Sequence, residues 1–168
     1  VPPRLAVVVG IELSCRWWPP DGGRSTGLHL LGYLLDGDDA ELRDTCRRLR
    51  SSRLARGRTM VERLSADGVP VSWEQVAALA GDASVGRPHV ARALVDAGVV
   101  TSVDQAFERY LYTGSPYYVG KEELDAVAAV RLVRGCGGVP VFAHPLARRR
   151  GRVVGDDAVA ALAATGLA

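Results

Sequence analysis

The sequence has 168 residues, of which 48% are hydrophobic and 24% are charged, and its formal net charge is +2. This composition excludes a wholly disordered chain and indicates one globular domain, or one domain that carries a small insert. No stretch approaches the ~20 consecutive apolar residues of a membrane helix, so no membrane association is predicted. The three cysteines are far apart, which argues against a disulfide framework or a thiolate zinc site and predicts reduced thiols in a cytoplasmic protein.

The first part of the sequence predicts two strands. Residues 4–15 form an apolar, mostly β-branched run, which is typical of a strand covered on both faces. Glu12 interrupts this run, and we expect it to be buried, where an unpaired carboxylate costs several kcal/mol. Residues 17–23 are rich in breaker residues and predict a loop or hairpin tip, and residues 28–35 predict the second strand.

Residues 38–118 carry helical signals and no strand pattern. A long helix is predicted to begin at Asp38 or Asp39 and to end at Gly68, although Gly57 weakens its middle. Three short helices follow, of which the last is predicted to end near Gly114. Their starts are indicated by two capping boxes and one proline, namely Ser72 with Gln75, Pro88, and Ser102 with Gln105.

The last part of the sequence alternates between helix and strand. Residues 121–134 predict a helix, residues 139–143 a short apolar strand and residues 157–164 a final helix, with a basic loop at 148–152. The whole order of strand, strand, helical block, helix, strand and helix indicates an α/β fold.

Arginines crowd the long predicted helix, at positions 43, 47, 48, 50, 53, 56, 58 and 63. One interpretation is a solvated helix face. The other is a patch that faces phosphate, because the guanidinium fork matches phosphate oxygens.

The three histidines of the sequence are His29, His89 and His144. A lone histidine is usually a surface residue or a hydrogen-bonded core residue, but His29 lies inside an apolar strand and His144 directly follows another. In α/β barrels, the C-terminal ends of strands hold the reacting groups. Together with Glu12, the two imidazoles form a ligand set that suits Zn²⁺, Mn²⁺ or Fe²⁺. Spacing alone leaves both interpretations open.

Arg87 and His89 lie at the predicted start of a helix, on either side of Pro88. Free backbone N–H groups and the helix dipole favour an anion at such a position, and Arg87 adds a bidentate fork. The functional interpretation is a phosphate site. The alternative is a helix started by proline that has a histidine in its first turn.

Four motifs occur in order along the chain: GIELS at 10–14, HLLGY at 29–33, GRPHVA at 86–91 and GGVPVFAHP at 137–145. Together with YL at 110–111 and GSPYY at 114–118, they resemble the PHP (polymerase and histidinol phosphatase) family of metal-dependent phosphoesterases. The resemblance is to members with a helical insert, which remove phosphate from 3′,5′-nucleoside bisphosphates or trim short RNAs.

This resemblance implies a fold and a domain organisation. The family fold is a distorted (β/α)₇ barrel, and the chain is expected to form an incomplete barrel of this type with an inserted small helical domain. Residues 1–37 would supply barrel strands with the Glu12 and His29 motifs. Residues 38–118 would form the helical segment with the inserted lid, and residues 119–168 a barrel helix, the His144 strand and a following helix.

The resemblance also implies the site. Glu12, His29 and His144 would be metal ligands, and Arg87 and His89 would bind the substrate phosphate. No catalytic residue is implied beyond a metal-bound hydroxide that attacks phosphorus. The expected cofactor is a divalent metal, Mn²⁺ in the first place, with Zn²⁺, Fe²⁺ or Mg²⁺ as alternatives. The expected partner is a nucleotide or short RNA substrate, without a membrane or an obligate protein partner.

The sequence departs from the family pattern, because it lacks the first His-x-His motif and the closing Asp-x-His motif. We therefore expect a fragment of a larger phosphoesterase, nearly inactive alone because its three ligands hold at most one metal. An alternative is a non-catalytic nucleotide- or RNA-binding remnant with a degraded metal cluster. A third hypothesis is that the arginine-rich helix and the loop at 148–152 form an RNA-binding surface.

Overall fold

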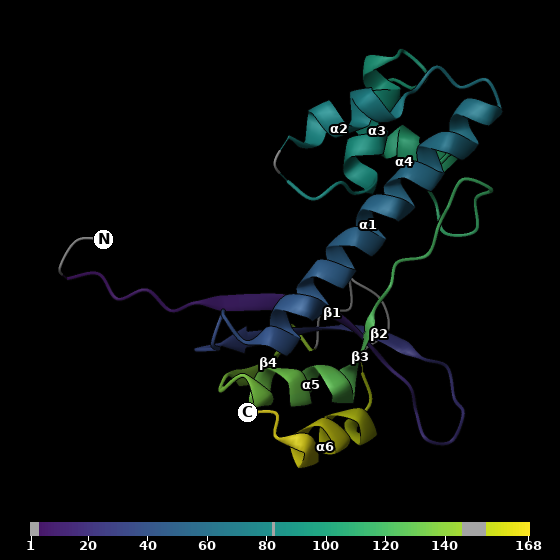
Figure 1. Ribbon diagram of the computed structural model, residues 1–168. Coiled ribbons are helices and arrows are strands. Elements are labelled where there is room, and N and C mark those ends of the chain that lie inside the picture. Colours follow the sequence, from purple (N-terminus) through teal and green to yellow (C-terminus); the bar gives the residue numbers. More distant parts are fainter. Residues whose placement is uncertain (1–3, 82, 146–153) are drawn as a thin grey trace. The chain divides into compact units, whose positions relative to one another are not determined.

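The computed structural model describes residues 4–81, 83–145 and 154–168, and Figure 1 shows its helices and strands. The chain divides into two compact units. One consists of residues 1–46 and 123–168, and the other of residues 47–122. The first unit contains the sheet, and the described residues of the second are helices and turns.

A four-stranded sheet forms the centre of the first unit. Its strands are β1 (Gly10–Trp17), β2 (Thr26–Tyr33), β3 (Leu124–Asp125) and β4 (Val139–Ala143), in the spatial order β3-β1-β2-β4. Strand β2 is antiparallel to both β1 and β4, whereas β3 pairs with β1 in parallel. The predicted α/β class is confirmed.

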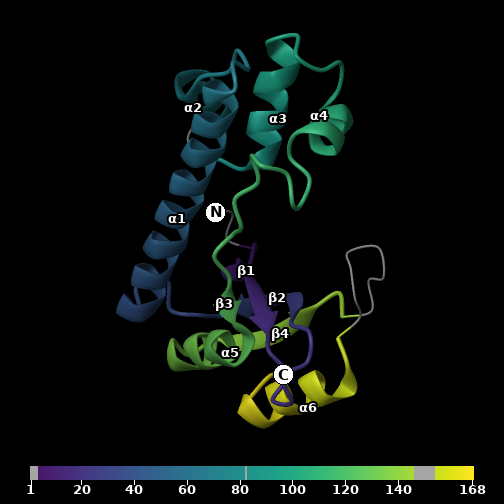
Figure 2. The same cartoon turned by 90° about the vertical axis from the view of Figure 1, so that its right-hand side faces the viewer.

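Two helices, α5 (Ala126–Gly135) and α6 (Asp156–Thr165), lie on the same side of this sheet (Figures 1 and 2). Alternate strand residues such as Leu13, Cys15 and Leu30 are buried in one hydrophobic core with these helices. Full burial of a large apolar side chain contributes about 1.5–3 kcal/mol. Packing on this face therefore stabilises the sheet. The strand residues that alternate with the buried ones lie on the opposite face.

The strand predicted over residues 4–15 is confirmed from Gly10 onward, but its early start and its cover on both faces were wrong. Strand β1 begins at Gly10, and the preceding Val7 is 64% exposed. Within β1, buried and less buried residues alternate, which is the pattern of a strand with one face on a core. The strand also runs on to Trp17, a buried residue that was predicted to lie in the loop.

The helix predicted for residues 121–134 begins later, at Ala126. The Asp125 side chain caps it by accepting a hydrogen bond from the Ala128 N–H at 2.9 Å. Just before β3, the Glu123 carboxylate accepts a hydrogen bond at 2.6 Å from Arg16 Nε of β1. This segment therefore pairs with β1 instead of forming a first helical turn.

The described part of the second unit contains four helices, of which the first begins in the other unit: α1 (Ala40–Ala66), α2 (Trp73–Ala80), α3 (Arg87–Asp96) and α4 (Val103–Arg109). The prediction of a helical segment is confirmed. Its core consists of apolar side chains from all four helices and the following turns, among them Leu64, Val76, Val90, Leu94, Ala106 and Leu111.

One of the two predicted capping boxes is closed. Ser72 Oγ accepts from the Gln75 N–H, and Gln75 Oε1 accepts from the Ser72 N–H at 2.9 Å. At α4, Ser102 Oγ accepts from the Gln105 N–H, but Gln105 Oε1 accepts from the Thr101 N–H instead. Only half of the second predicted capping box is therefore formed, because the Thr101 N–H competes with the Ser102 N–H for the Gln105 side-chain oxygen.

Helix α4 ends at Arg109, earlier than the predicted end near Gly114. The residues that follow form turns, in which Ser115 Oγ donates a hydrogen bond to the Tyr110 carbonyl. Leu111 is fully buried in the helical core. Burial of the Leu111 side chain stabilises the turn that ends α4 before Gly114.

Gly57 in α1 has a packing role that the sequence did not reveal. A Cβ atom at this position would lie 2.9 Å from Val85 Cγ1, which is closer than real Cβ contacts. Alanine gains ~1 kcal/mol of helix propensity over glycine, but overpacking typically costs about 1–3 kcal/mol. We expect Gly57→Ala to lower the free energy of unfolding by about 1 kcal/mol, measured by urea denaturation.

The matched control is Gly135→Ala at the end of α5, where no atom lies within 4 Å of the added Cβ. This change should leave stability unchanged or raise it. Val85→Ala removes the clash. In that background, Gly57→Ala should raise the free energy of unfolding relative to Val85→Ala alone. A stabilising Gly57→Ala in the original chain would contradict the packing argument.

Two further expectations depend on which residues are described. No helix in the described ranges is both long and apolar enough to cross a membrane. The predicted basic loop at 148–152 lies outside the described residues, so its part in an RNA-binding surface stays a prediction.

Candidate metal centre and phosphate-binding residues

Glu12, His29 and His144 come from three neighbouring strands of the sheet. His29 on β2 is paired with Ser14 on β1 and with Ala143 on β4. Glu12 lies two residues from Ser14, and His144 directly follows Ala143. Side chains two residues apart share a face, so the register places Glu12 diagonally beside His29.

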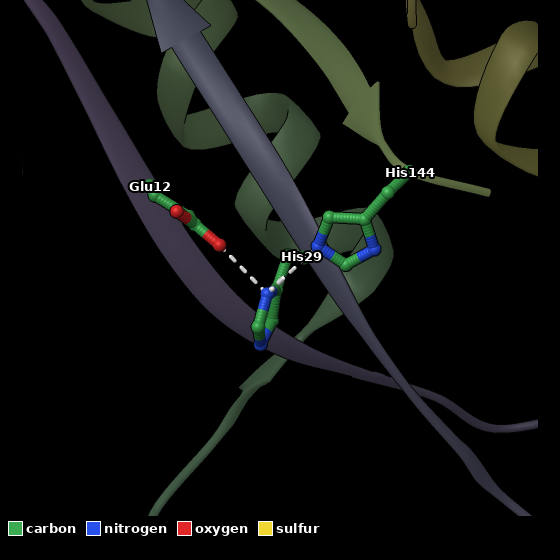
Figure 3. Close-up of side chains that lie close together, drawn as sticks. All are labelled: Glu12, His29 and His144. Carbon is green, nitrogen blue, oxygen red and sulfur yellow. Dashed lines mark hydrogen bonds and ion pairs between the residues drawn. The ribbon is translucent and has the colours of Figure 1, made fainter. Parts of the chain in front are cut away.

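The three side chains point toward one another (Figure 3). His29 Nδ1 lies 2.7 Å from Glu12 Oε1 and 3.2 Å from His144 Nε2. One ligand atom from each of the three residues lies within 4.8 Å of the others. The expected convergence of these three residues is confirmed, whereas their role as metal ligands stays a prediction.

Glu12 is not buried as expected. Its side chain is 52% exposed in the described structure, and that of His29 is 28% exposed. The apolar neighbours of Glu12, Ile11 and Leu13, pack into hydrophobic clusters that Glu12 does not join. The carboxylate therefore has no desolvation cost of the size that the sequence suggested.

The contacts of His29 Nδ1 show how well the three groups fit a cation. One hydrogen on this nitrogen can fully serve either the Glu12 carboxylate or the second imidazole, but not both. A cation in the same place would accept lone pairs from all three groups. Ligand bonds of about 2.0–2.2 Å put ligand atoms roughly 3–3.5 Å apart. The 2.7 Å and 3.2 Å distances from His29 Nδ1 are close to this range. The donor set and its geometry therefore fit a divalent metal.

The backbone of His144 is unusual. Its φ angle is 37°, which lies in the left-handed region that non-glycine residues rarely adopt. Such a conformation costs of order 1–3 kcal/mol, and residues that adopt it cluster at functional sites. Here it accompanies the turn that directs the His144 imidazole toward His29.

His89 caps its own helix. Its Nδ1 accepts a hydrogen bond of 3.0 Å from the Gly86 N–H, which fixes the ring at the start of α3. The neutral ring therefore carries its hydrogen on Nε2, where it can be donated to another group. A helix that has proline near its start and His89 in its first turn is therefore present, whereas phosphate binding by His89 stays a prediction.

Arg87 is held rigidly in the helical unit. Its Nη1 donates to the Leu111 carbonyl at 3.1 Å. The guanidinium carbon also lies 5.4 Å from the ring centroid of Phe107 and 5.3 Å from that of Tyr118. Cation–π contacts of this kind fix a guanidinium without neutralising its charge.

The predicted site residues fall into two sets. Glu12, His29 and His144 belong to the unit with the sheet, and Arg87 and His89 to the helical unit. A phosphate-binding role for the second set stays a prediction.

The sequence alone indicated no individual role for Arg56, whose Nε is buried and has no hydrogen-bond partner among the described residues. Its position in the arginine-rich helix is the one signal in the sequence that points to it.

No protein-family model matches the chain. The chain is 30% identical over 142 residues to a 5′-3′ exoribonuclease of Haemophilus influenzae, which covers 84% of this chain and 49% of the relative. It is 33% identical over 137 residues to a 3′,5′-nucleoside bisphosphate phosphatase of Chromobacterium violaceum, which covers 81% of this chain and 46% of the relative.

Two solved structures are also similar. One is a protein of Bifidobacterium adolescentis described as a metal-dependent phosphoesterase, with 32% identity and a TM-score of 0.77. The other is an amidohydrolase of Chromobacterium violaceum with bound sulfate, with 30% identity and a TM-score of 0.75. Each match covers 95% of this chain and 55% of the other chain.

The chain spans about half the length of the curated relatives it matches. The matches nevertheless cover more than four-fifths of its own residues, so they include both the sheet and the helical unit. The chain is therefore a homologue of bacterial exoribonucleases and nucleoside bisphosphate phosphatases, which confirms its resemblance to the PHP-type metal-dependent phosphoesterases.

Proposed function

We propose that the protein carrying this chain is a metal-dependent phosphoesterase that hydrolyses phosphate monoesters of nucleotides, of the 3′,5′-nucleoside bisphosphate type, or trims short RNA ends by hydrolysing phosphodiester bonds. The observation that carries this proposal is the convergence of Glu12, His29 and His144 from three strands onto one point. The names of the relatives, an exoribonuclease and a bisphosphate phosphatase, supply the substrate class.

The proposal includes the finer fold. We regard the sheet of β1 to β4 as part of a distorted (β/α)₇ barrel and residues 47–122 as the helical insert. The likeness to a metal-dependent phosphoesterase over 95% of the chain supports this assignment.

Glu12, His29 and His144 would hold a divalent cation. Mn²⁺ is our first choice and Zn²⁺, Fe²⁺ or Mg²⁺ are alternatives, because one carboxylate and two imidazoles suit metals of intermediate softness. When bound, such a cation supplies Lewis acidity toward a phosphoryl oxygen and activates water. The three residues would position the cation. The strand register that places them does not depend on a bound metal.

Arg87 and His89 would bind the substrate phosphate. Arg87 uses Nη1 for the Leu111 carbonyl, and the rest of its fork remains for an anion. His89 would donate from Nε2, because its Nδ1 is occupied by the Gly86 N–H. The sulfate in the similar Chromobacterium violaceum structure supports an oxyanion ligand for such a protein.

The test is a phosphate-release assay on adenosine 3′,5′-bisphosphate, together with a mononucleotide-release assay on a short RNA with a 5′-phosphate. It is run on the 168-residue chain and on the complete protein that carries it. We expect turnover by the complete protein with Mn²⁺, its loss in EDTA and its recovery when Mn²⁺ is added back. Binding of these compounds without release of phosphate or of mononucleotides under any metal would favour the non-catalytic alternative and contradict our proposal.

A further inference from the structure

Arg56 differs from the neighbouring basic residues of α1. Arg63 donates to the Pro116 and Tyr118 carbonyls, and Arg48 forms an ion pair with Glu122. By contrast, Arg56 Nε is buried and lacks a hydrogen-bond partner within the described ranges. A buried donor without an acceptor is costly and rare in folded proteins, so this one calls for a partner.

The surroundings of Arg56 disfavour its charge. Burial lowers the pKa of the Arg56 guanidinium, and the positive charge of Arg87 lowers it further, as does that of Arg53, whereas Tyr118 acts in the opposite direction. The contact of Val85 with Gly57 places the part of α1 that carries Arg56 against the segment that leads into Arg87. Positive charges therefore gather in a partly dehydrated place. An anion between them would reverse the sign of this interaction.

The other groups nearby are also arranged as donors. Arg87 is fixed by the Leu111 carbonyl and by two aromatic rings, so its orientation does not depend on a ligand. Ser84 Oγ is a second buried polar atom that has no hydrogen-bond partner among the described residues. Ser84 precedes Val85, which packs against Gly57, the residue next to Arg56.

We infer that Arg56 and Arg87 form a phosphate-binding site within the helical unit, with the Ser84 hydroxyl as an additional donor. Fixed guanidinium donors match the oxygens of a phosphate group. The inference rests on the proposed function for the identity of the anion, which we take to be a phosphate of a nucleotide or of an RNA strand. It goes beyond that function because it adds Arg56 to the substrate-binding residues.

The test measures binding without metal, so that it is independent of hydrolysis. In EDTA, the affinity for adenosine 3′,5′-bisphosphate is measured by calorimetry for the original chain and for Arg56→Met. We expect the Kd to rise at least tenfold, which corresponds to about 1.4 kcal/mol. The control is Arg50→Met, an exposed residue of the same helix, which removes the same charge and should change the Kd less than twofold.

Thermal unfolding separates a ligand-binding role from a structural one. Without ligand, Arg56→Met should unfold at the same or a higher temperature, because it removes a guanidinium whose buried Nε has no hydrogen-bond partner among the described residues. With the bisphosphate, the gain in Tm seen for the original chain should be lost. Arg56→Lys, which keeps the charge but not the Nε donor, should fold normally and still bind several-fold more weakly.

Unchanged Kd values of both Arg56 variants, for the bisphosphate and for a short oligoribonucleotide alike, would overturn the inference, and so would an equal loss of affinity in Arg50→Met. A short oligoribonucleotide as second ligand distinguishes the source of the phosphate. Loss confined to the oligonucleotide assigns the site to a backbone phosphate, whereas loss for both ligands assigns it to a terminal phosphate. Normal phosphate release by Arg56→Met together with an unchanged Kd would leave the proposed function intact and reject only this site.

Discussion

Replacing Glu12, His29 or His144 with glutamine is expected to raise the Kd for Mn²⁺ or Zn²⁺ at least 100-fold and to abolish phosphate release by the complete protein. Loss of a group that merely orients a metal ligand typically costs 10–100-fold in affinity, and loss of a ligand costs at least as much. The three ligand atoms converge within 4.8 Å, so each removal opens the same coordination sphere. Competition with a chelating dye gives the metal affinity, and phosphate release gives the activity.

These variants should fold normally, because the three side chains lie on the face opposite the core of α5 and α6. Glu41→Gln is the matched control: it removes one exposed carboxylate in the first turn of α1, outside the cluster. Its metal affinity should equal that of the original chain. Tight metal binding by all three cluster variants would show that the metal is held elsewhere and that this site is misassigned.

Replacing Arg87 is expected to give the second-largest effect on turnover. Arg87→Ala in the complete protein should lower kcat/KM for adenosine 3′,5′-bisphosphate more than tenfold, or by roughly 1.4 kcal/mol of transition-state stabilisation. A bidentate guanidinium that stabilises the charge on a transferring phosphoryl group explains a loss of this size. Steady-state kinetics of phosphate release at saturating Mn²⁺ measure it.

Arg87 also has a structural role, because it donates to the Leu111 carbonyl and lies against Phe107 and Tyr118. Arg87→Lys therefore accompanies the alanine variant, since it keeps the charge and the apolar stem but loses the fork. It should retain the melting temperature and still lose most of the activity. Arg92→Ala is the control: this exposed residue of the same helix pairs with Asp96, and its loss should leave kcat/KM unchanged. Unchanged kcat/KM in both Arg87 variants would remove Arg87 from the substrate site.

Local signals in the sequence were sufficient for most helices. The closed capping box at Ser72 and Gln75 begins α2, and Gly166, with a φ of 110°, ends α6 as expected for a left-handed C-cap. Such signals act within one helical turn, so they are readable without knowledge of the rest of the fold. The four ordered motifs likewise single out Glu12, His29 and His144 from residue type and order alone.

Where contacts distant in sequence compete with local preference, the sequence was misleading. Residues 124–125 join β1 as a short strand instead of beginning a helix, because Glu123 binds Arg16 across the sheet. Gln105 caps the Thr101 N–H, and α4 ends early where Leu111 enters the core. The apolar run at 4–15 suggested burial on both faces, yet exposure along β1 is set by which face α5 and α6 cover.

The candidate site combines both levels. The amino-acid sequence was enough to indicate which residues carry the chemistry and that they would lie on or directly after strands. The packed fold was needed to establish that Glu12 is exposed and that it meets His29 diagonally across the β1–β2 pair. It also packed Gly57, next to Arg56, against Val85 near the start of α3, a contact that spacing along the chain does not reveal. This division arises because side-chain type is local, whereas register, burial and charge proximity depend on the packing of segments far apart in sequence.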